Sequence, residues 1–393
     1  MLGHPRTNQQ VKWGYAVSRL ADQPRTWGGI SDRVMMDDGG GVPEAGDLLI
    51  AQIDELGHHS RLDLNSGTKC TLYPGDVVAV SFAARYATKV MEAEIPDSLE
   101  EIHFLSAGGV CGRVLGMAND ANEPTTLHPL GYLCEGGKRI NLRTYALPQR
   151  PPAPHEASVI IVVGSAMDSG KTTAAFSLVH GLTNAGIRTG AAKITGTATA
   201  KDPRGMWDAG ASLVYDFTHM GYGSTAGLTP DELSNIAETI IANLAHDGAR
   251  AIVIEIADGI TQRETDLLLH HFATRGIAGV VYTCNDSMGV PSGLDRLTSM
   301  GHRVLAISGS MTRTELAARE AQSETHVPVL TREQLRDPSV VDSLDLTGSG
   351  TRASNNGTHN GVHPTYRNDA SGVVTRTWGR DRREQLSNQG DER

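Results

Sequence analysis

The sequence of 393 residues lacks several features that mark common classes of protein. No apolar run approaches the ~20 residues of a membrane-spanning helix, and Met1–Arg6 opens no apolar stretch of signal-peptide length. The four cysteines have no paired C-x-x-C spacing, which argues against a zinc site or a disulfide framework. A net charge of −10 gives no electrostatic reason to bind nucleic acid or an anionic membrane. We therefore expect a cytoplasmic protein with reduced thiols that acts on a small molecule, without nucleic acid or membrane as a partner.

Composition divides the chain into four parts, since its length exceeds what one hydrophobic core usually serves. Residues 1–147 carry short alternating and β-branched segments, which predict a small β-barrel or sandwich. Residues 148–157 hold four prolines within Pro148–Pro154 and are predicted to form an extended linker. Residues 158–342 alternate strand and helix patterns. Residues 343–393 have no sustained apolar period and are predicted to be a disordered tail.

Seven short segments of the first part have the composition of strands. They are Val11–Val17, Asp47–Ile53, Arg61–Leu64, Lys69–Tyr73, Asp76–Phe82, Gly112–Met117 and Arg139–Tyr145. Asn65-Ser66-Gly67 predicts a hairpin turn. Adjacent residues of a strand point to opposite faces, so we interpret His58 and His59 as solvated turn residues rather than a metal pair. The glycines of Ser106–Val110 indicate a tight backbone approach, interpreted as a bulge rather than a binding loop.

The second part begins with a phosphate-binding pattern. The apolar run Val159–Val163 leads into a loop bracketed by Gly164 and Gly170, after which Lys171 and Thr172 open a helix. Five residues separate the two glycines, one more than in the standard motif. Loop N–H groups and the helix start suit anionic oxygens, the lysine suits the outer phosphates, and the threonine hydroxyl suits Mg²⁺. The residues assigned to the triphosphate are Gly164, Ser165, Asp168, Ser169, Gly170, Lys171, Thr172 and Thr173.

Helix and strand patterns alternate after this loop. We expect a helix over Lys171–Asn184 and strands over Arg188–Ile194, Ala251–Ile256, Gly279–Tyr282 and Val304–Ile307. Thr229-Pro-Asp-Glu232 has the form of a capping box, and apolar residues follow it at helical spacing. Such an alternation builds a parallel sheet with helices on both faces, and ligands bind at the carboxyl ends of its strands.

Polar residues stand at three of these strand ends. The first end carries Lys193, followed by Thr195, Thr197 and Thr199 and by Asp202 and Asp208. Glu255 lies inside an apolar strand and Asp258 at its end; a carboxylate so placed needs a cation, either Mg²⁺ or a structural ion-pair partner. The third end carries Asn285, whose amide suits a purine edge, although Asn-Asp is also common in turns.

This order of residues resembles the dethiobiotin synthetase group of P-loop proteins. It is also similar to the nucleotide-binding protein of molybdopterin-guanine dinucleotide biosynthesis and to a set of poorly described bacterial proteins, over about Ser158 to Asp337. The resemblance implies that Lys171 holds the triphosphate, that Lys193 contacts the substrate anion and that Asn285 reads adenine. It further implies Mg²⁺ ligation by Thr172, Asp208 and Glu255, and a homodimer across the substrate site. The first part of the chain has no counterpart in the synthetases, and Ile254–Gly259 departs from their glycine-rich run.

The function predicted from these residues is ATP- and Mg²⁺-dependent phosphoryl transfer to a small polar metabolite. The enzyme would be a kinase, or a ligase that acts through an acyl phosphate, with Lys171, Lys193 and Asp258 as catalytic residues. Two alternatives from other classes remain: a nucleotide-gated, GTPase-like binding module, and an acyltransferase that uses the loop to hold a cofactor's phosphates. The sequence leaves the substrate, the purine and the role of the first part open.

Overall fold

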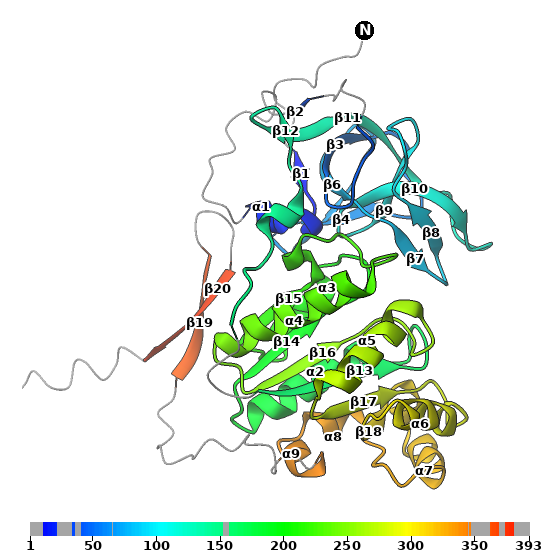
Figure 1. Ribbon diagram of the computed structural model, residues 1–393, viewed down its shortest axis with the longest axis vertical. Coiled ribbons are helices and arrows are strands. Elements are labelled where there is room, and N and C mark those ends of the chain that lie inside the picture. Colours follow the sequence, from blue (N-terminus) through cyan, green and yellow to red (C-terminus); the bar gives the residue numbers. More distant parts are fainter. Residues whose placement is uncertain are drawn as a thin grey trace, which may run out of the picture. The chain divides into compact units, whose positions relative to one another are not determined.

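The computed structural model describes residues 11–21, 34–35, 41–64, 66–151, 157–344, 346, 362–368 and 374–380. Residues 1–351 make up one compact unit and residues 352–393 another. The first unit contains a β-rich part and an α/β part, drawn in blue to cyan and in green to orange in Figure 1. The predicted fold class, a parallel-sheet P-loop domain preceded by a small β-rich domain, is confirmed.

Five strands close the small barrel of the β-rich part. In order around it they are β6 (Val77–Phe82), β3 (Leu48–Ile53), β11 (Thr125–Glu135), β9 (Ile102–Ser106) and β10 (Val110–Met117), which pairs back to β6. The β6–β10 pair is parallel and the other four pairs are antiparallel. All six residues of β6 are buried, because one of its faces lines the barrel core and the other is covered by neighbouring elements.

Shorter elements decorate this barrel. The hairpin of β7 (Arg85–Ala87) and β8 (Met91–Glu94) extends the sheet beyond β10, and β4 (Arg61–Asp63) pairs with β5 (Lys69–Thr71) as a separate hairpin. The remaining elements are β1 (Lys12–Trp13), η1 (Tyr15–Val17), α1 (Ser18–Ala21), β2 (Val34–Met35), β12 (Lys138–Arg139) and η3 (Leu142–Tyr145). The β4–β5 hairpin confirms the turn predicted around Asn65-Ser66-Gly67, of which Asn65 lies outside the described residues.

Two of the seven predicted strands are wrong over much of their length. Only Lys12–Trp13 of the first is a strand, because Tyr15–Val17 turn into a 3₁₀ helix in which all three residues are buried. Only Arg139 of Arg139–Tyr145 lies in a strand, because the Asn141 side chain accepts from the Arg143 N–H and starts a 3₁₀ helix. Strands β2, β7, β8, β9 and β11 have no counterpart among the seven predicted segments.

The α/β part is built on a six-stranded parallel sheet. Its order is β15–β14–β16–β13–β17–β18. The bounds are β13 (Ser158–Gly164), β14 (Thr189–Lys193), β15 (Leu213–Asp216), β16 (Ala251–Glu255), β17 (Gly279–Thr283) and β18 (Val304–Ser308). Strands β13, β16 and β17 are buried throughout, as their continuous apolar runs predict.

Helices cover both faces of this sheet. One face packs against α2 (Lys171–Asn184), α3 (Lys201–Asp208), α8 (Arg332–Arg336) and α9 (Val340–Ser343). The other face packs against α4 (Pro230–His246), α5 (Arg263–Arg275), α6 (Gly289–Ser299) and α7 (Glu315–Ser323). The short helices η4 (Phe217–Met220) and η5 (Ser310–Arg313) complete the part. The capping box at Thr229 and Glu232 and the buried apolar face of α4 are confirmed.

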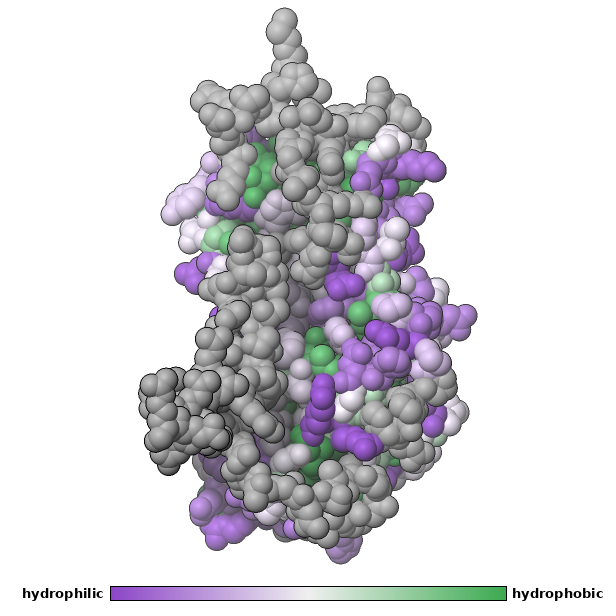
Figure 2. Space-filling view, turned by 90° about the vertical axis from the view of Figure 1, so that its left-hand side faces the viewer, coloured by the Kyte–Doolittle hydropathy of each residue, from purple (hydrophilic) through white to green (hydrophobic). Residues whose placement is uncertain are grey.

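One face of the described residues is mainly polar. On the face drawn in Figure 2, hydrophilic side chains cover most of the coloured surface and apolar side chains form small, separate patches. Among the described residues, no helix combines the length and apolar content that crossing a membrane requires.

The α/β core extends beyond the boundary predicted at residue 342. Leu344 and Leu346 are each only 1% exposed and pack in the same cluster as α2. In the second unit, β19 (Val362–Asn368) pairs antiparallel with β20 (Val374–Arg380), within the stretch predicted to be disordered. The predicted start of the disordered tail at residue 343 is therefore too early in the sequence. Residues 347–361, 369–373 and 381–393 lie outside the described residues.

Two truncations should separate the core from the tail. Truncation after Asp342 removes the buried Leu344 and Leu346, each worth about 1.5–3 kcal/mol of burial, and should lower the melting temperature by several degrees. Truncation after Thr351 keeps both leucines and should change the melting temperature little. Differential scanning calorimetry of the two proteins beside the full chain makes the comparison; equal losses would contradict the placement of these leucines in the core.

The barrel is joined to the carboxyl-end loops of the parallel sheet by buried polar contacts. Asp63 accepts from the hydroxyl of Thr199 at 3.0 Å and from the N–H of Ala200 at 3.1 Å. Tyr15 donates to the buried Asp216 at 3.0 Å. The first residue of the predicted linker is held against α4, because Asn243 of that helix donates to the Pro148 carbonyl at 2.9 Å. The barrel therefore contacts the sheet at the edge where ligands are expected.

Gly108 allows the closest of these contacts. A Cβ at this position would stand 2.0 Å from the carbonyl oxygen of Ala198. The glycines of Ser106–Val110 thus permit a tight backbone approach, and a register shift between Val110 and Cys111 agrees with the predicted bulge.

Gly108→Ala should lower the free energy of unfolding by about 1–3 kcal/mol, because the added methyl forces the two backbones apart. Gly116→Ala is the matched control: a Cβ there meets nothing within 4 Å, so a change within about 0.5 kcal/mol is expected. Urea denaturation of both variants measures the difference, and an equal effect would contradict a tight junction at Gly108.

Candidate functional site

The loop between β13 and α2 has the backbone of a phosphate-binding loop. A Cβ on Gly164 would lie 2.0 Å from Ser169 Oγ, and Gly170 adopts φ 100° with Gly309 close behind it. Both positions therefore require glycine. The Ser165 N–H donates to the Thr283 carbonyl at 2.8 Å, which fastens the loop to β17. Asp168 also has a positive φ of 66°, which a short polar residue tolerates. This is the loop of a P-loop NTPase fold.

Lys171 is the first residue of α2 and is 6% exposed. Its Nζ donates to the Ala166 carbonyl at 2.8 Å, across the loop that it closes. Burial lowers the pKa of the ammonium, and the nearby carboxylates of Glu255 and Asp258 oppose that shift. Lys171 is thus a cation held inside the loop by one neutral acceptor, which suits an exchange of that acceptor for a phosphate oxygen.

Thr172 and Glu255, the Mg²⁺ ligands that the resemblance implies, contact each other at the loop. The Thr172 hydroxyl donates to Glu255 Oε1 at 2.7 Å, and Glu255 is 1% exposed. Its other oxygen, Oε2, is buried without a hydrogen-bond partner. An orphaned carboxylate oxygen beside a hydroxyl is the donor set that Mg²⁺ prefers, so these residues fit a magnesium ion.

Lys193 stands at the end of β14 with only 12% of its side chain exposed, and it is not the exposed lysine that its position at a strand end also allows. Its Nζ pairs with Asp202 and lies 3.8 Å from Glu255 Oε1. Burial lowers the pKa of this ammonium, but Glu255 and Asp202 more than offset that effect and hold it above its usual range. Lys193 thus stands as a fixed positive charge next to the Thr172–Glu255 pair.

Asp208 is the one predicted metal ligand that the structure does not bring to this group. It is the exposed last residue of α3, whereas Asp202, in the first turn of the same helix, is buried against Lys193. Among the described residues no cluster of three or more His, Cys, Asp or Glu side chains is placed to hold a metal ion. A magnesium ion here would depend on Thr172, Glu255 and the phosphates themselves, as is usual for Mg²⁺.

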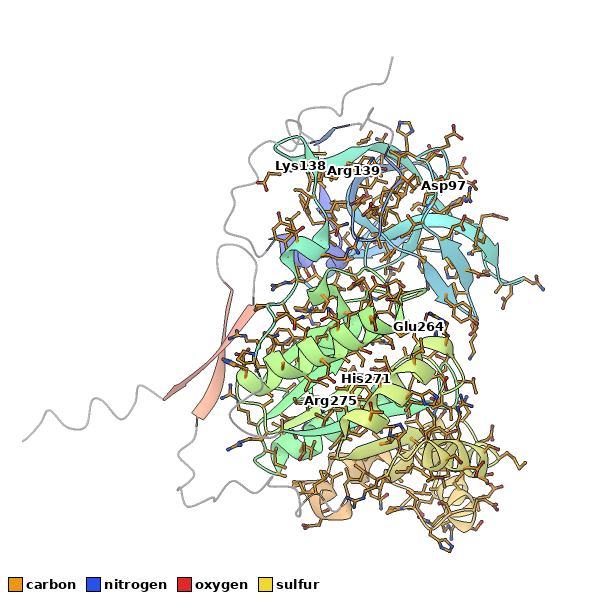
Figure 3. All side chains as sticks on the ribbon, viewed as in Figure 1. Asp97, Lys138, Arg139, Glu264, His271 and Arg275 are labelled. Atoms are coloured by element: carbon orange, nitrogen blue, oxygen red, sulfur yellow. The ribbon has the colours of Figure 1, made fainter. Side chains whose placement is uncertain are left out.

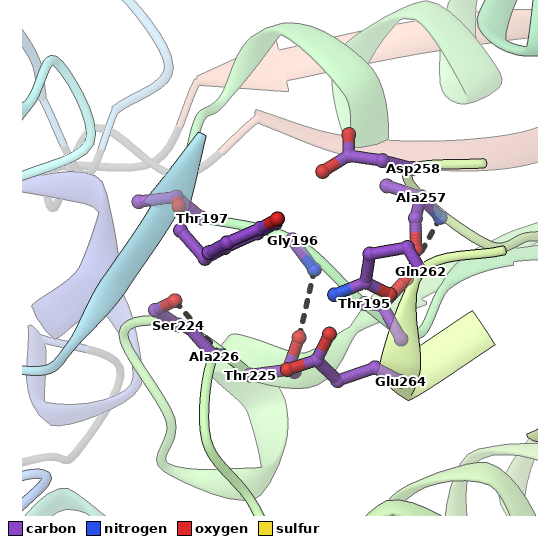
Figure 4. Close-up of a pocket in the computed structure, with 11 residues that line it drawn as sticks. Thr195, Gly196, Thr197, Ser224, Thr225, Ala226, Ala257, Asp258, Gln262 and Glu264 are labelled. Atoms are coloured by element: carbon purple, nitrogen blue, oxygen red, sulfur yellow. Dashed lines mark hydrogen bonds between the residues drawn. The ribbon is translucent and has the colours of Figure 1, made fainter. Parts of the chain in front are cut away.

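Asp258 connects the phosphate loop to a polar cavity (Figure 4). Burial raises the pKa of its carboxyl, while the charges of Lys171 and Lys193 oppose the rise. The cavity lies at the carboxyl ends of β14 and β16. It is lined by Tyr86, Thr195, Gly196, Thr197, Ser224, Thr225, Ala226, Ala257, Asp258, Gln262 and Glu264. Two of the hydroxyls at the first predicted strand end, Thr195 and Thr197, are therefore part of this site.

The barrel contributes to the site through the hairpin of β7 and β8. Tyr86 lines the cavity, and Lys89 in the turn pairs with Asp168 of the phosphate loop at 2.7 Å. Arg85 donates toward His59 Nε2 at 2.7 Å, and its Nε is buried without a partner. A bipartite site of this kind gives the β-rich part a role that its own sequence does not indicate.

The interpretation of His59 as a solvated turn histidine is wrong. Its ring is partly buried, and burial together with the charge of Arg85 lowers its pKa to about 3. The imidazole is neutral as a result, so that it accepts the hydrogen bond of Arg85. The prediction that His58 and His59 form no metal pair is unaffected.

A groove on the other side of the loop lies beside Asn285. It is lined by Gly170, Thr173, Ala174, Ser308, Gly309, Ser310, Thr312, Arg313, Arg332 and Glu333. Ser310 donates to Asn285 Oδ1 at 2.8 Å, which places the Asn285 amide at the edge of that groove. Thr173 therefore faces a space of its own, distinct from the cavity at Asp258.

No protein-family model and no curated protein matches the chain. Among solved structures it is similar to the signal recognition particle receptor FtsY from Elizabethkingia anophelis, with 16% identity over 53% of this chain and 75% of that one, and a TM-score of 0.33. The same receptor in complex with GDP gives 15% identity, coverage of 52% and 68%, and a TM-score of 0.32. Both similarities are weak, and the fold is defined by the strand order and the loop geometry above.

Several residues of the site give no signal in the sequence. Glu264 is an acid in the first turn of α5, where acids are common for the sake of the helix dipole. Tyr86, Arg85 and Lys89 come from a hairpin that was not predicted at all. Only the long-range packing of the barrel onto the sheet brings them to the loop.

Proposed function

We propose that the protein transfers the γ-phosphoryl group of ATP, with Mg²⁺, to a small polar metabolite, as the resemblance to the dethiobiotin synthetase group suggests. The observation that supports this best is the position of Asp258. Its carboxyl lines the polar cavity and lies within electrostatic reach of both Lys171 and Lys193. An acceptor in the cavity would thus stand beside the phosphates, the arrangement that phosphoryl transfer needs.

Each residue has a task in this proposal. Lys171 and the loop N–H groups would bind the triphosphate, and Thr172 with Glu255 would hold Mg²⁺, which would supply positive charge to the phosphates. Lys193, fixed by Asp202, stabilises negative charge that develops during transfer. Asp258 accepts the proton of the attacking group, a task that its raised pKa favours. The groove at Thr173 and Ser310 receives the nucleoside, with Asn285 at its edge.

A nucleotide-gated module is the second candidate. The contact of Lys89 with Asp168 favours it, because a loop change on hydrolysis would be passed to the barrel through that ion pair. In that case the chain hydrolyses nucleotide at the same rate with and without a metabolite. Acyl transfer, in which the loop would hold the phosphates of a cofactor, is the third candidate function.

ADP formation measured across a metabolite library distinguishes these functions. Transfer predicts release only with certain metabolites and a mass increase of one phosphoryl group on the acceptor, or on an acyl phosphate trapped with hydroxylamine. Metabolite-independent hydrolysis would favour the module instead. Calorimetry with ATP and GTP assigns the purine, and sedimentation tests the homodimer that the resemblance implies.

A further inference from the structure

The cavity at Asp258 holds a buried carboxylate that no cationic side chain among the described residues neutralises. Glu264, at the start of α5, is 5% exposed. Its Oε1 accepts from the Gly227 N–H at 3.1 Å, while Oε2 is buried without a hydrogen-bond partner. Figure 4 shows the carboxylate directed into the cavity, and Figure 3 places the residue on the side of α5 near β7. A buried carboxylate oxygen of this kind costs several kcal/mol unless a donor meets it.

The charge of the lining indicates which donor this is. Asp258 and Glu264 are the charged residues that line the cavity, and both are acidic. Asp258 lies near Lys171, Lys193 and Arg85, whose charges compensate its own. Glu264 has no ion pair with any cationic side chain among the described residues. The remaining negative charge therefore belongs to Glu264, and a cation from outside would balance it.

A metal ion is poorly served at this position. The described residues offer no group of three acidic or other metal-binding side chains here, and, unlike the Thr172–Glu255 pair, Glu264 is not placed beside the assigned phosphates that would complete the coordination of Mg²⁺. A primary ammonium group needs only a few acceptors. Glu264 Oε2 supplies one, and the hydroxyl and amide oxygens of Thr225 and Gln262 line the same cavity.

We propose that the cavity is the acceptor subsite and that the acceptor is a small molecule carrying a primary ammonium group, which Glu264 binds. The role of this molecule as acceptor rests on the proposed phosphoryl transfer. The binding of its ammonium group by Glu264 does not depend on that function. Tyr86 covers the subsite from the barrel, so that the β-rich part takes part in selecting the substrate. The subsite should prefer an ammonium ligand to a neutral one, because a neutral ligand leaves the charge of Glu264 uncompensated.

Matched pairs of small probes test this directly. Ethanolamine is compared with ethylene glycol, and 1,3-diaminopropan-2-ol with glycerol, by saturation-transfer NMR on the full chain with Mg²⁺ and a non-hydrolysable ATP analogue. Each ammonium probe should bind at least ~10-fold more tightly than its hydroxyl partner, as expected when one buried charge is compensated. Glu264→Gln should abolish the preference while keeping the acceptor for the Gly227 N–H. Equal binding within the pairs, or no binding of either ammonium probe, overturns the proposal.

Controls separate this site from general effects. Glu324→Gln changes an exposed acid at the end of α7 and should leave the preference intact. Glu264→Asp keeps the charge and should keep part of the preference, so it serves if the glutamine variant fails to fold. An unchanged preference in Glu264→Gln contradicts the proposal. If ammonium binding depends on Glu264 but no phosphoryl transfer is found, the subsite is supported and the proposed reaction is contradicted. If phosphoryl groups are transferred to metabolites that lack an ammonium group, the reaction is supported and the ammonium subsite is contradicted.

Discussion

Lys171→Ala is expected to abolish turnover and to weaken ATP binding by roughly 10- to 100-fold. A charge-assisted hydrogen bond to a phosphate contributes about 1.5–3 kcal/mol, and the structure holds this ammonium inside the loop, bound to the single carbonyl of Ala166. Adenosine lacks phosphates and should bind equally to the wild type and the variant. Isothermal calorimetry with ATP and adenosine measures both affinities.

Lys201→Ala is the matched control for this change. Lys201 is an exposed lysine at the first position of α3, and its loss should alter neither ATP affinity nor turnover. The melting temperature of each variant shows whether the fold is kept. An unchanged ATP affinity in folded Lys171→Ala would remove the assignment of the loop to phosphate.

The phosphate loop and the parallel sheet could be predicted because their signals are local. Gly170, Lys171 and Thr172 sit at fixed offsets from an apolar strand, and the backbone around them adopts the same arrangement wherever that order occurs. Thr229 and Glu232 likewise fix the start of α4 through two reciprocal hydrogen bonds between neighbours in sequence. Neither feature depends on distant parts of the chain.

The partners of these residues could not be predicted, because they depend on packing over long distances. Asp202 and Asp208 both follow Lys193 in sequence, but only the direction of α3 decides that Asp202 meets the lysine. The β7–β8 hairpin pairs with β10, and its contact with the loop depends on how the barrel packs against the sheet. Burial of Glu264 depends on the Ser224–Gly227 turn, which lies about forty residues earlier.

Lys193→Ala should lower kcat by ~100-fold or more and leave ATP affinity nearly unchanged, since only contacts with charge developing in transfer are lost. The structure adds a second consequence. Lys193 is the partner of two buried carboxylates, Asp202 and Glu255, and removing the cation leaves them uncompensated at a cost of about 3–5 kcal/mol. Loss of activity in this variant alone would therefore not separate catalysis from stability.

The double variant Lys193→Ala/Asp202→Asn makes that separation. It removes the cation together with the carboxylate closest to it, while Glu255 keeps its hydrogen bond from Thr172, so stability should return toward that of the wild type. Asp202→Asn alone keeps the ammonium and should retain turnover within a few-fold. Lys193→Arg should rescue poorly, because a planar guanidinium does not replace a compact charge in a fitted position. Single-turnover rates and urea denaturation of all four proteins decide the matter: a stable double variant that still turns over slowly assigns Lys193 to charge stabilisation in transfer. Near-wild-type turnover in that protein would show that Lys193 serves only to neutralise Asp202 and takes no part in the transfer.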